Sequence, residues 1–279
     1  MTRSEPLAQQ IARNIENDIQ AGRLRDGERL ASSRELAKEW DVSVFTINEA
    51  MDLLAKKGLV VSKARSARTV HAPDQELHRE VRTSTPQVVM VGGYAGSGKT
   101  ELGRVLARES GWPMLDKDSL TRFVVEAALE LQGVSRNDRE SEVYLTKIRP
   151  AEYESLLEAM TENVQVGNSA IVTAPFLREF SDESWLKQAD ATCRKLGADL
   201  TIVWVYCDEE TMHTYIRHRD APRDSSKLAD WDKYMKGVNV DFRPSVPHVV
   251  VDNSVSGGLL VDQARQLIAQ VTEEGAIRK

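Results

Sequence analysis

Residues 93–100 read Gly-Tyr-Ala-Gly-Ser-Gly-Lys-Thr and directly follow the apolar run Val88–Val91. The stretch fits the pattern GxxxxGK followed by Ser or Thr, in which glycines let the backbone curl so that successive N–H groups face phosphate oxygens. Lys99 supplies a positive charge for the β- and γ-phosphates, the hydroxyl of Thr100 is a ligand for Mg²⁺, and the helix that begins there directs its positive dipole end at the anion. The sequence therefore predicts a nucleoside triphosphate site for ATP and Mg²⁺. The predicted nucleotide ligands in this stretch are Gly93, Gly96, Ser97, Gly98, Lys99 and Thr100.

The length and composition of the chain indicate two globular domains. Its 279 residues exceed one typical domain, and 41% of them are hydrophobic. The polar stretch from His71 to Pro86 marks a boundary, so we expect a first domain at residues 1–72, a linker at 73–86 and a second domain at 87–279. No apolar run reaches the roughly 18 residues of a membrane helix, and the N-terminus has no signal-peptide core, which predicts a cytoplasmic protein.

The net charge of −6 is unevenly divided, with +1 in residues 1–75 and −7 in the remainder. Because the first segment is not strongly basic, any contact with nucleic acid must come from a local basic face. The acidic remainder argues against DNA binding by the second domain alone. Two cysteines, Cys193 and Cys207, are present without a CxxC motif and indicate neither a disulfide framework nor a zinc site.

The N-terminal part of the chain shows the pattern of three helices. Leu7–Ile19 carries an apolar residue at every fourth position, which predicts one apolar face on a helix that Gly22 can end. Ser32 and Glu35 form a capping box for a second helix. Ser43 can cap a third helix, which has its own apolar stripe.

Apolar runs at residues 59–62 and 69–71 flank a basic tip and predict a hairpin. Helix, turn, helix and basic hairpin in this order, over about residues 5–72, resemble the winged helix-turn-helix domain of GntR-type bacterial transcription regulators. The motifs that carry the resemblance are Gly22-Arg23-Leu24, Gly27-Glu28-Arg29-Leu30, Ser33-Arg34-Glu35-Leu36-Ala37 and Val42-Ser43. The resemblance implies a third helix in the major groove, a wing on the DNA backbone or minor groove, and a homodimer on a two-fold symmetric operator. The implied DNA contacts are Arg34, Ser43, Thr46, Asn48, Lys63, Arg65 and Arg68.

This segment departs from the family pattern at DNA-facing positions. Val44 and Asn48 stand where the family usually has Arg, and Ser66 and Ala67 replace the wing-tip glycines. Asn can still read adenine, so DNA binding is the favoured function. The alternative is a winged helix that only dimerises or contacts protein, with Val44 and Phe45 as an apolar patch.

The second domain alternates apolar runs with helical stretches, which predicts an α/β fold with a parallel sheet covered by helices on both faces. The runs are Val88–Val91, Met114-Leu115, Ala170–Thr173, Leu200–Tyr206 and Val249–Val251. Ligands of such folds bind beyond the carboxyl ends of the strands.

Two carboxylates follow the second of these strands. Asp118 can accept a proton from a substrate hydroxyl that attacks the γ-phosphate, and Asp116 is the candidate to hold Mg²⁺ through water. The alternative role for Asp118, compatible with the first, is to cap a helix.

Two further groups are candidates for nucleotide contacts. Arg217, Arg219 and Arg223 lie close together at the end of a predicted helix, where lid arginines neutralise charge on a transferred phosphoryl group. A solvated charged face is the alternative. The stretch Val251-Asp252-Asn253-Ser254 at the last strand is expected to line the nucleotide base pocket, with Asp252 as a nucleotide contact.

Residues 86–275 resemble the small P-loop kinases of the group that includes gluconate kinase, chloramphenicol phosphotransferase, polynucleotide kinase and zeta-type toxins. The resemblance rests on the phosphate loop, Asp118, the lid arginines and the final run Val251-Asp252-Asn253-Ser254. It implies that Asp118 is the catalytic base. Thr121 stands where the group has an assisting Arg, and strand 170–175 lacks the usual Walker B Asp. These departures affect phosphoryl transfer rather than ATP binding.

Together these patterns predict a DNA-binding transcription regulator whose effector domain is an ATP-binding P-loop kinase fold. Nucleotide or a small hydroxyl-bearing ligand would modulate its DNA affinity. The alternative is an ATP-dependent small-molecule kinase whose winged helix is vestigial or dimerises. A toxin-like kinase fused to its own repressor would use the same residues.

Overall fold

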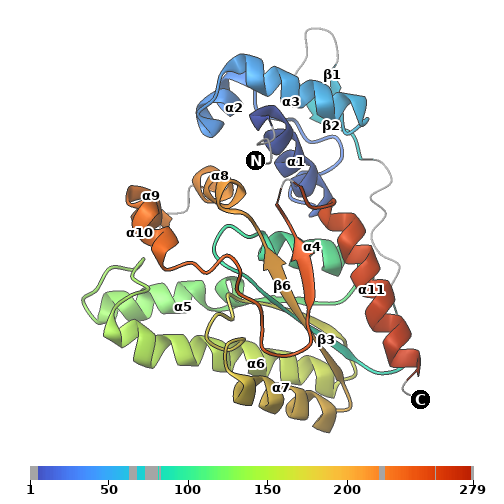
Figure 1. Cartoon of the computed structure of the whole chain (residues 1–279), viewed down its shortest axis with the longest axis vertical. Helices are drawn as coiled ribbons and strands as arrows, with labels where there is room; N and C mark the ends of the chain where they lie inside the picture. The colour runs from blue at the N-terminus through green and yellow to red at the C-terminus, as the bar shows by residue number, and fades with distance from the viewer. Residues whose placement is uncertain are drawn as a thin grey trace.

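The computed structural model describes residues 6–62, 68–72, 81, 83–219, 224–254 and 256–277. These residues form an N-terminal helical segment with a small hairpin and a larger α/β part built on a parallel sheet (Figure 1). The predictions for Lys63, Arg65 and Arg223 concern positions outside the described residues.

The N-terminal segment is a winged helix-turn-helix, as the sequence predicts. Its elements are α1 (Leu7–Gln20), α2 (Ser33–Trp40), α3 (Val44–Lys56), β1 (Val60–Ser62) and β2 (Arg68–Val70), with β1 and β2 antiparallel. Ser32 Oγ accepts the Glu35 N–H, and the Glu35 carboxylate accepts the Ser32 N–H at 2.8 Å, which confirms the capping box. Ser43 Oγ accepts the Thr46 N–H at 3.0 Å and caps α3 in the same way.

The larger part contains five parallel strands in the described residues, in the order β4-β5-β3-β6-β7. Their bounds are β3 (Gln87–Gly92), β4 (Met114–Asp116), β5 (Ala170–Thr173), β6 (Asp199–Tyr206) and β7 (Val249–Asp252), which confirms the predicted runs. Strand β3 is central and every residue in it is buried. From β3 the chain passes to β4 and β5 on one side of this strand and then crosses to β6 and β7 on the other side. The crevice that binds ligands in such folds therefore lies at the carboxyl end of β3.

Helices cover both faces of the sheet. Their bounds are α4 (Lys99–Ser110), α5 (Lys117–Leu131), α6 (Arg149–Gln165), α7 (Glu183–Lys195), α8 (Glu209–Arg219), α9 (Ser225–Ala229), α10 (Trp231–Lys236) and α11 (Leu260–Ile277), with a π-helical turn η1 at Tyr144–Ile148. On one face α4 and α11 pack Leu102 and Leu267 into a core with Val91 of β3. On the other face α6 packs Leu156 into a core with Val88, and α7 joins the same core. The alternation of buried residues along β3 therefore serves two separate cores.

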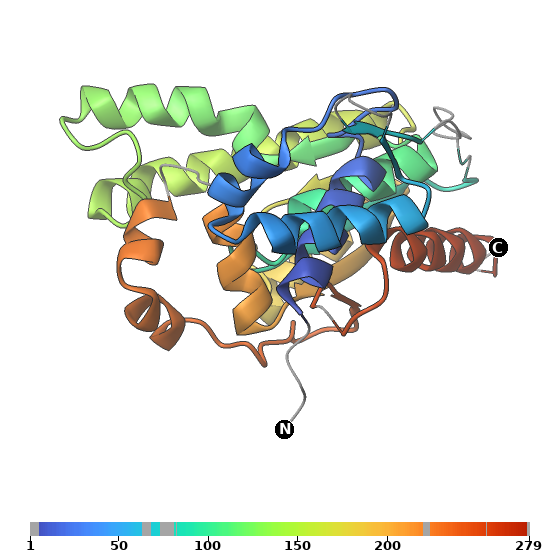
Figure 2. The same cartoon turned by 90° about the horizontal axis from the view of Figure 1, so that it is seen from above.

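Helix α1 lies between α3 and the sheet-forming part (Figure 1), and in the view from above α3 lies over it (Figure 2). Ile11, Ile15 and Ile19 enter the winged-helix core with α3. The prediction that Leu7 shares this face is wrong, because Leu7 is 42% exposed. Five polar residues of α1 are buried too, namely Gln10, Arg13, Asn14, Glu16 and Asn17. Their side of the helix approaches α4 and α11.

Gly103 sets how closely α4 approaches the sheet. A Cβ at this position would lie 2.6 Å from Thr173 Cγ2 and 2.9 Å from Met114 Cε. We expect Gly103→Ala to lower the free energy of unfolding by about 1–3 kcal/mol, measured by urea denaturation, because overpacking forces the helix from the sheet. Gly237→Ala is the control, since its Cβ meets nothing closer than Tyr234 O at 3.4 Å. Equal stability of the two variants would contradict this account of the packing.

Candidate functional site

The loop between β3 and α4 adopts a conformation that requires glycine. Gly96 and Gly98 have φ of +80° and +90°, in the left-handed region that disfavours other residues. A Cβ on Gly98 would lie 2.1 Å from Asn253 Nδ2, and one on Gly93 would lie 2.4 Å from Ser97 Oγ. The loop therefore curls tightly ahead of the N-terminus of α4, as a phosphate cradle requires.

The side chains of the loop lie at the carboxyl edge of the sheet. Lys99 Nζ donates to Tyr94 O at 3.4 Å, and Lys99 borders two separate cavities. Ser97 is 1% exposed, and Thr100 is half-buried in the first turn of α4. The Thr100 hydroxyl fits an Mg²⁺ ligand when phosphate oxygens complete the coordination shell. Within the described ranges, no three His, Cys, Asp or Glu side chains gather so that they could hold a metal ion by themselves.

The end of β7 contributes an amide rather than a carboxylate to the loop. Asn253 is 1% exposed, and its Nδ2 donates to Ser97 O at 3.0 Å. Asp252, which the sequence predicts as a base-pocket residue, instead accepts the Ser254 N–H at 2.8 Å and does not line the adjoining cavity. Since side chains alternate along an extended chain, neighbouring residues face opposite ways. Asn253 belongs to the predicted stretch Val251-Asp252-Asn253-Ser254 and is the residue of that stretch that reaches the phosphate loop.

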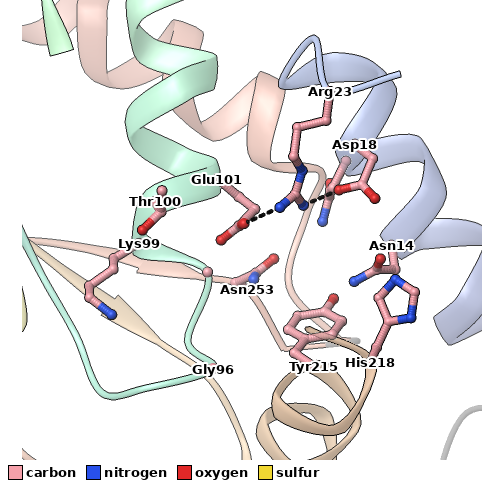
Figure 3. A pocket seen from close by; sticks show the side chains of 12 residues that line it. Asn14, Asp18, Arg23, Gly96, Lys99, Thr100, Glu101, Tyr215, His218 and Asn253 are labelled. Carbon is pink, nitrogen blue, oxygen red and sulfur yellow. Dashed lines mark hydrogen bonds and ion pairs between the residues drawn. The ribbon is translucent and has the colours of Figure 1, made fainter. Parts of the chain in front are cut away.

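The first cavity has a volume of about 260 Å³ and lies between the phosphate loop, α8 and α1 (Figure 3). It is lined by Asn14, Asn17, Asp18, Arg23, Gly96, Gly98, Lys99, Thr100, Glu101, Tyr215, His218 and Asn253. The first four of these belong to α1 and the turn after it. The sequence predictions missed them, because the polar positions of α1 read as the solvated side of an amphipathic helix.

Arg23 joins the winged-helix segment to the first turn of α4. Its guanidinium donates to Glu101 Oε1 at 2.7 Å and to the Asp18 carboxylate (Figure 3). Burial raises the pKa of Asp18 to about 6, against the opposing effect of Arg23. This ion-paired group places a cation from the winged-helix segment in the cavity that Thr100 also lines.

Helix α8 docks on the end of α2. His218 stacks on Trp40 with ring centroids 3.7 Å apart, and its Nδ1 lies 3.7 Å from Glu39 Oε1. Arg217 forms an ion pair with Asp41. Burial, together with the nearby Arg23 charge, lowers the pKa of His218 to about 4, so the stacked ring is neutral at pH 7.

Of the predicted lid arginines, the structure describes the side-chain contacts of Arg217. Arg217, predicted to contact nucleotide, pairs with the winged-helix segment and does not line the first cavity. Arg219 is the last residue of α8, and Arg223 lies outside the described residues. The α8 residues that do reach the cavity are Tyr215 and His218.

The second cavity, of about 430 Å³, lies on the other side of Lys99. Its cationic lining residues are Lys99, Lys117, Arg139, Arg149, Arg178 and Lys227, and its acidic ones are Asp118 and Asp224. Arg149 is paired with Glu179 at 2.9 Å, and Lys227 with Asp224 at 2.7 Å. The excess of positive charge in a concave site favours an anionic ligand.

Asp118 is held beside this cavity by a buried network. Lys117 Nζ lies 2.9 Å from Asp118 Oδ1 and 2.6 Å from Glu152 Oε1. Glu152 is 3% exposed and also accepts from Thr121 Oγ1 at 2.9 Å and from the Tyr144 hydroxyl at 2.8 Å. Thr121, which replaces an Arg of the kinase group, therefore holds Glu152 in place.

Asp116, not Asp118, caps α5, which corrects the capping role considered for Asp118. Asp116 Oδ1 accepts the Ser119 N–H at 2.9 Å, and its Oδ2 accepts the Thr173 hydroxyl at 2.7 Å. Both carboxylate oxygens are thus engaged, and contact with a metal through water remains compatible with this geometry.

Among the described residues, the predicted DNA contacts lie on α2, at the start of and within α3, and on β2. Arg34 is exposed, while Asn48 Oδ1 accepts from Ser33 Oγ at 2.9 Å and from Arg68 Nη2 at 3.2 Å. Ser43 and Thr46 hydrogen-bond each other at the N-terminus of α3. On the same turn lies the apolar patch expected from the sequence, formed by Val44 at 42% and Phe45 at 70% exposure.

Comparison with known proteins accounts for both parts. The profile of the AAA_33 family, described as an AAA domain, matches residues 88–239, more than half of the chain. The chain belongs to this family. The profile of bacterial regulatory proteins of the gntR family matches residues 7–70, so the N-terminal segment is a GntR-type helix-turn-helix domain. This combination is that of a regulator with a kinase-like effector domain, and the effector fold implies nucleotide binding.

Individual relatives match one part or the other. A shikimate kinase of Moorella thermoacetica is 31% identical over 118 residues, 41% of this chain and 66% of the relative. The uncharacterized HTH-type transcriptional regulator YdeL of Bacillus subtilis is 39% identical over 61 residues, 22% of this chain and 13% of that protein. The chain thus spans slightly under two thirds of the shikimate kinase and a small share of the regulator.

A solved structure from Chloroflexus aurantiacus J-10-fl has a TM-score of 0.50 and 19% identity, covering 67% of this chain and 98% of its own, which shows a shared fold. No helix in the described ranges has the length and apolar character needed to cross a membrane.

The docking of His218 on Trp40 predicts a pH dependence of stability. At a pH well above 6.5 the imidazole is neutral in both the folded and the unfolded chain. As the pH falls through 6.5 toward 4, the unfolded chain binds a proton that the folded one excludes, so stability is lost. Between pH 7.5 and 5 the wild type should lose about 2 kcal/mol relative to His218→Gln. Unfolding free energies of both chains at the two pH values measure this, and the contribution of Asp18, which has the opposite sign, cancels in the comparison. If the unfolding free energies of the wild type and His218→Gln differed by the same amount at both pH values, the neutral, buried imidazole would be contradicted.

Proposed function

We propose that the ligand state of the P-loop domain sets the DNA affinity of this GntR-type regulator. The observation that supports this proposal is the contact between α8 and α2, in which Arg217 pairs with Asp41 and His218 stacks on Trp40. An arginine that pairs with Asp41 cannot at the same time neutralise a nucleotide phosphate. Nucleotide that recruits Arg217 would therefore weaken the contact and change how the winged helix is held. Coupling of this kind typically amounts to about 1–3 kcal/mol and is reciprocal between the two ligands.

The nucleotide we propose is ATP with Mg²⁺. The backbone of the loop and Lys99 would hold the phosphates, and Thr100, with Asp116 through water, would hold the metal ion, which neutralises phosphate charge when bound. The left-handed conformations of Gly96 and Gly98 support this, because they curl the loop backbone ahead of α4 so that its N–H groups can face phosphate oxygens.

A second candidate function, phosphoryl transfer, is favoured by the cationic cavity beside Asp118. We propose that this cavity takes a small anion that also bears a hydroxyl group. The hydroxyl oxygen would attack the γ-phosphorus, its proton would pass to the Asp118 carboxylate, and the bond to the leaving ADP would break. Lys117, held by Glu152, positions Asp118 for this role.

The DNA site we propose is a two-fold symmetric operator bound by a homodimer, with Arg34, Ser43, Thr46, Asn48 and the wing residues Lys63, Arg65 and Arg68 as contacts. The Asn48 amide is already oriented by Ser33 and Arg68. The domain limits 1–72, 73–86 and 87–279 and a cytoplasmic location remain part of this proposal.

Two substitutions separate nucleotide binding from transfer. Lys99→Ala should lower ATP affinity by about 2–5 kcal/mol, because the point charge facing the phosphates is lost. Asp118→Asn should leave ATP affinity nearly unchanged and remove any phosphoryl transfer. Calorimetry with ATP and Mg²⁺, and a transfer assay with candidate hydroxy acids, measure both. Unchanged ATP affinity in Lys99→Ala would contradict the assignment of the site.

The coupling itself is tested with DNA from upstream of the chain's own gene. Operator affinity of the wild type should differ between the ATP·Mg²⁺-bound and nucleotide-free protein, measured by fluorescence anisotropy. In Asp41→Asn, which removes the partner of Arg217, the ratio of the two affinities should move toward one. Asp52→Asn is the control, because Asp52 is an exposed acidic residue of the same segment outside this contact. Identical operator affinities of the wild type without nucleotide, with ADP and with ATP would refute the proposal.

A further inference from the structure

The cavity between α1, the phosphate loop and α8 holds buried polar atoms that have no hydrogen-bond partner among the described residues. They are Asn14 Oδ1, Tyr215 OH, His218 Nδ1 and Asn253 Oδ1. Asn14 is 8% exposed and Asn253 1%. His218 Nδ1 lies 3.7 Å from Glu39 Oε1, whereas the other three atoms belong to residues that line the cavity. Because an unpaired buried polar atom destabilises a fold, these three indicate a ligand that pairs with them.

These four side chains surround the same space (Figure 3). Asn14 comes from α1, Tyr215 and His218 come from α8, and Asn253 comes from the end of β7. The cavity of about 260 Å³ has room for on the order of ten or more water molecules, which is enough for a planar heterocycle. The uncharged lining residues Asn14, Tyr215 and Asn253, beside the mutually paired charges of Arg23, Asp18 and Glu101, suit a neutral, hydrogen-bonding ring.

The position of Lys99 between the two cavities indicates which part of a bound nucleotide would enter the first cavity. Lys99 borders both cavities, whereas Asp118 borders the second. A nucleoside triphosphate whose γ-phosphate faces Asp118 must therefore extend its ribose and base into the first cavity. Helix α1 lies there, beyond Gly98 and Thr100.

We propose that helix α1 of the winged-helix segment forms one wall of the nucleobase site, with Asn14 hydrogen-bonding the base. This inference rests on the proposed binding of nucleotide to the phosphate loop. Adenine suits the site, because its exocyclic amino group donates to an amide oxygen such as Asn14 Oδ1, and the Tyr215 hydroxyl can donate to a ring nitrogen. The same helix packs Ile11 and Ile15 into one core with the DNA-reading helix α3. The base is thus in contact with the element that supports DNA recognition.

The test compares ATP with inorganic tripolyphosphate, which has the phosphates and lacks the base and ribose. Calorimetry on the full chain with Mg²⁺ should show that Asn14→Ala lowers ATP affinity about tenfold, the loss expected for one hydrogen bond, with tripolyphosphate affinity unchanged. Tyr215→Phe, which removes a single oxygen, should behave in the same way. Gln9→Ala, an exposed position of α1 outside the cavity, should bind both as the wild type does.

The outcomes separate this inference from the proposed function. Wild-type ATP affinity in both Asn14→Ala and Tyr215→Phe, with binding lost in Lys99→Ala, would overturn the α1 wall and leave nucleotide binding intact. An equal loss of ATP and tripolyphosphate affinity in both variants would also overturn it, because the effect would not involve the base. Failure of the wild-type chain to bind either compound would overturn the proposed function and this inference together.

Discussion

The burial of α1 on both of its sides is the constraint on which the arrangement of the two parts depends. Its isoleucines enter the winged-helix core, while its polar side contacts the P-loop part. Arg13 donates to Gly258 O of the P-loop part at 2.7 Å, whereas Glu16 pairs at 2.6 Å with Lys57, which follows α3 in the winged-helix segment. Because buried polar groups need partners, this helix cannot rotate or shift without breaking hydrogen bonds on one side or apolar packing on the other.

The phosphate loop divides the ligand-binding edge of the sheet into two regions with different chemistry. The region toward α1 and α8 is lined by amides, a phenol, an imidazole and the mutually paired charges of Arg23, Asp18 and Glu101, and the region toward α5 and α6 by an excess of cations. Lys99 stands between them. Under the proposed function, the first region selects the base and the second selects the acceptor, and the phosphates lie between.

Helix α8 connects these regions to the DNA-binding part. Tyr215 and His218 of this helix line the first cavity, while Arg217, one residue before His218, forms an ion pair with Asp41. Successive residues of a helix point about 100° apart, so one short segment can face a ligand and a neighbouring domain together. The low pKa of His218 follows from this position, because the docked winged helix shields the ring from water.

The sequence by itself determined the local features. The glycine spacing at 93–100, the capping box at Ser32 and the alternating apolar runs each depend on neighbours in the chain, and the structure confirms them. Both family assignments follow from such local motifs. The acidic pair after the second strand was also found, although the cap proved to be Asp116.

The tertiary structure decided what the polar side of α1 contacts, which partner Arg217 takes and which residue of the last strand faces the loop. A helical stripe of Asn, Asp and Arg has the same periodicity whether water or another domain covers it, so Asn14, Asn17 and Asp18 carried no local signal of a cavity. The alternation Val251-Asp252-Asn253 likewise does not tell which polar residue points inward. Those choices depend on contacts between residues up to 245 positions apart, as between Arg13 and Gly258, and no motif within either part encodes them.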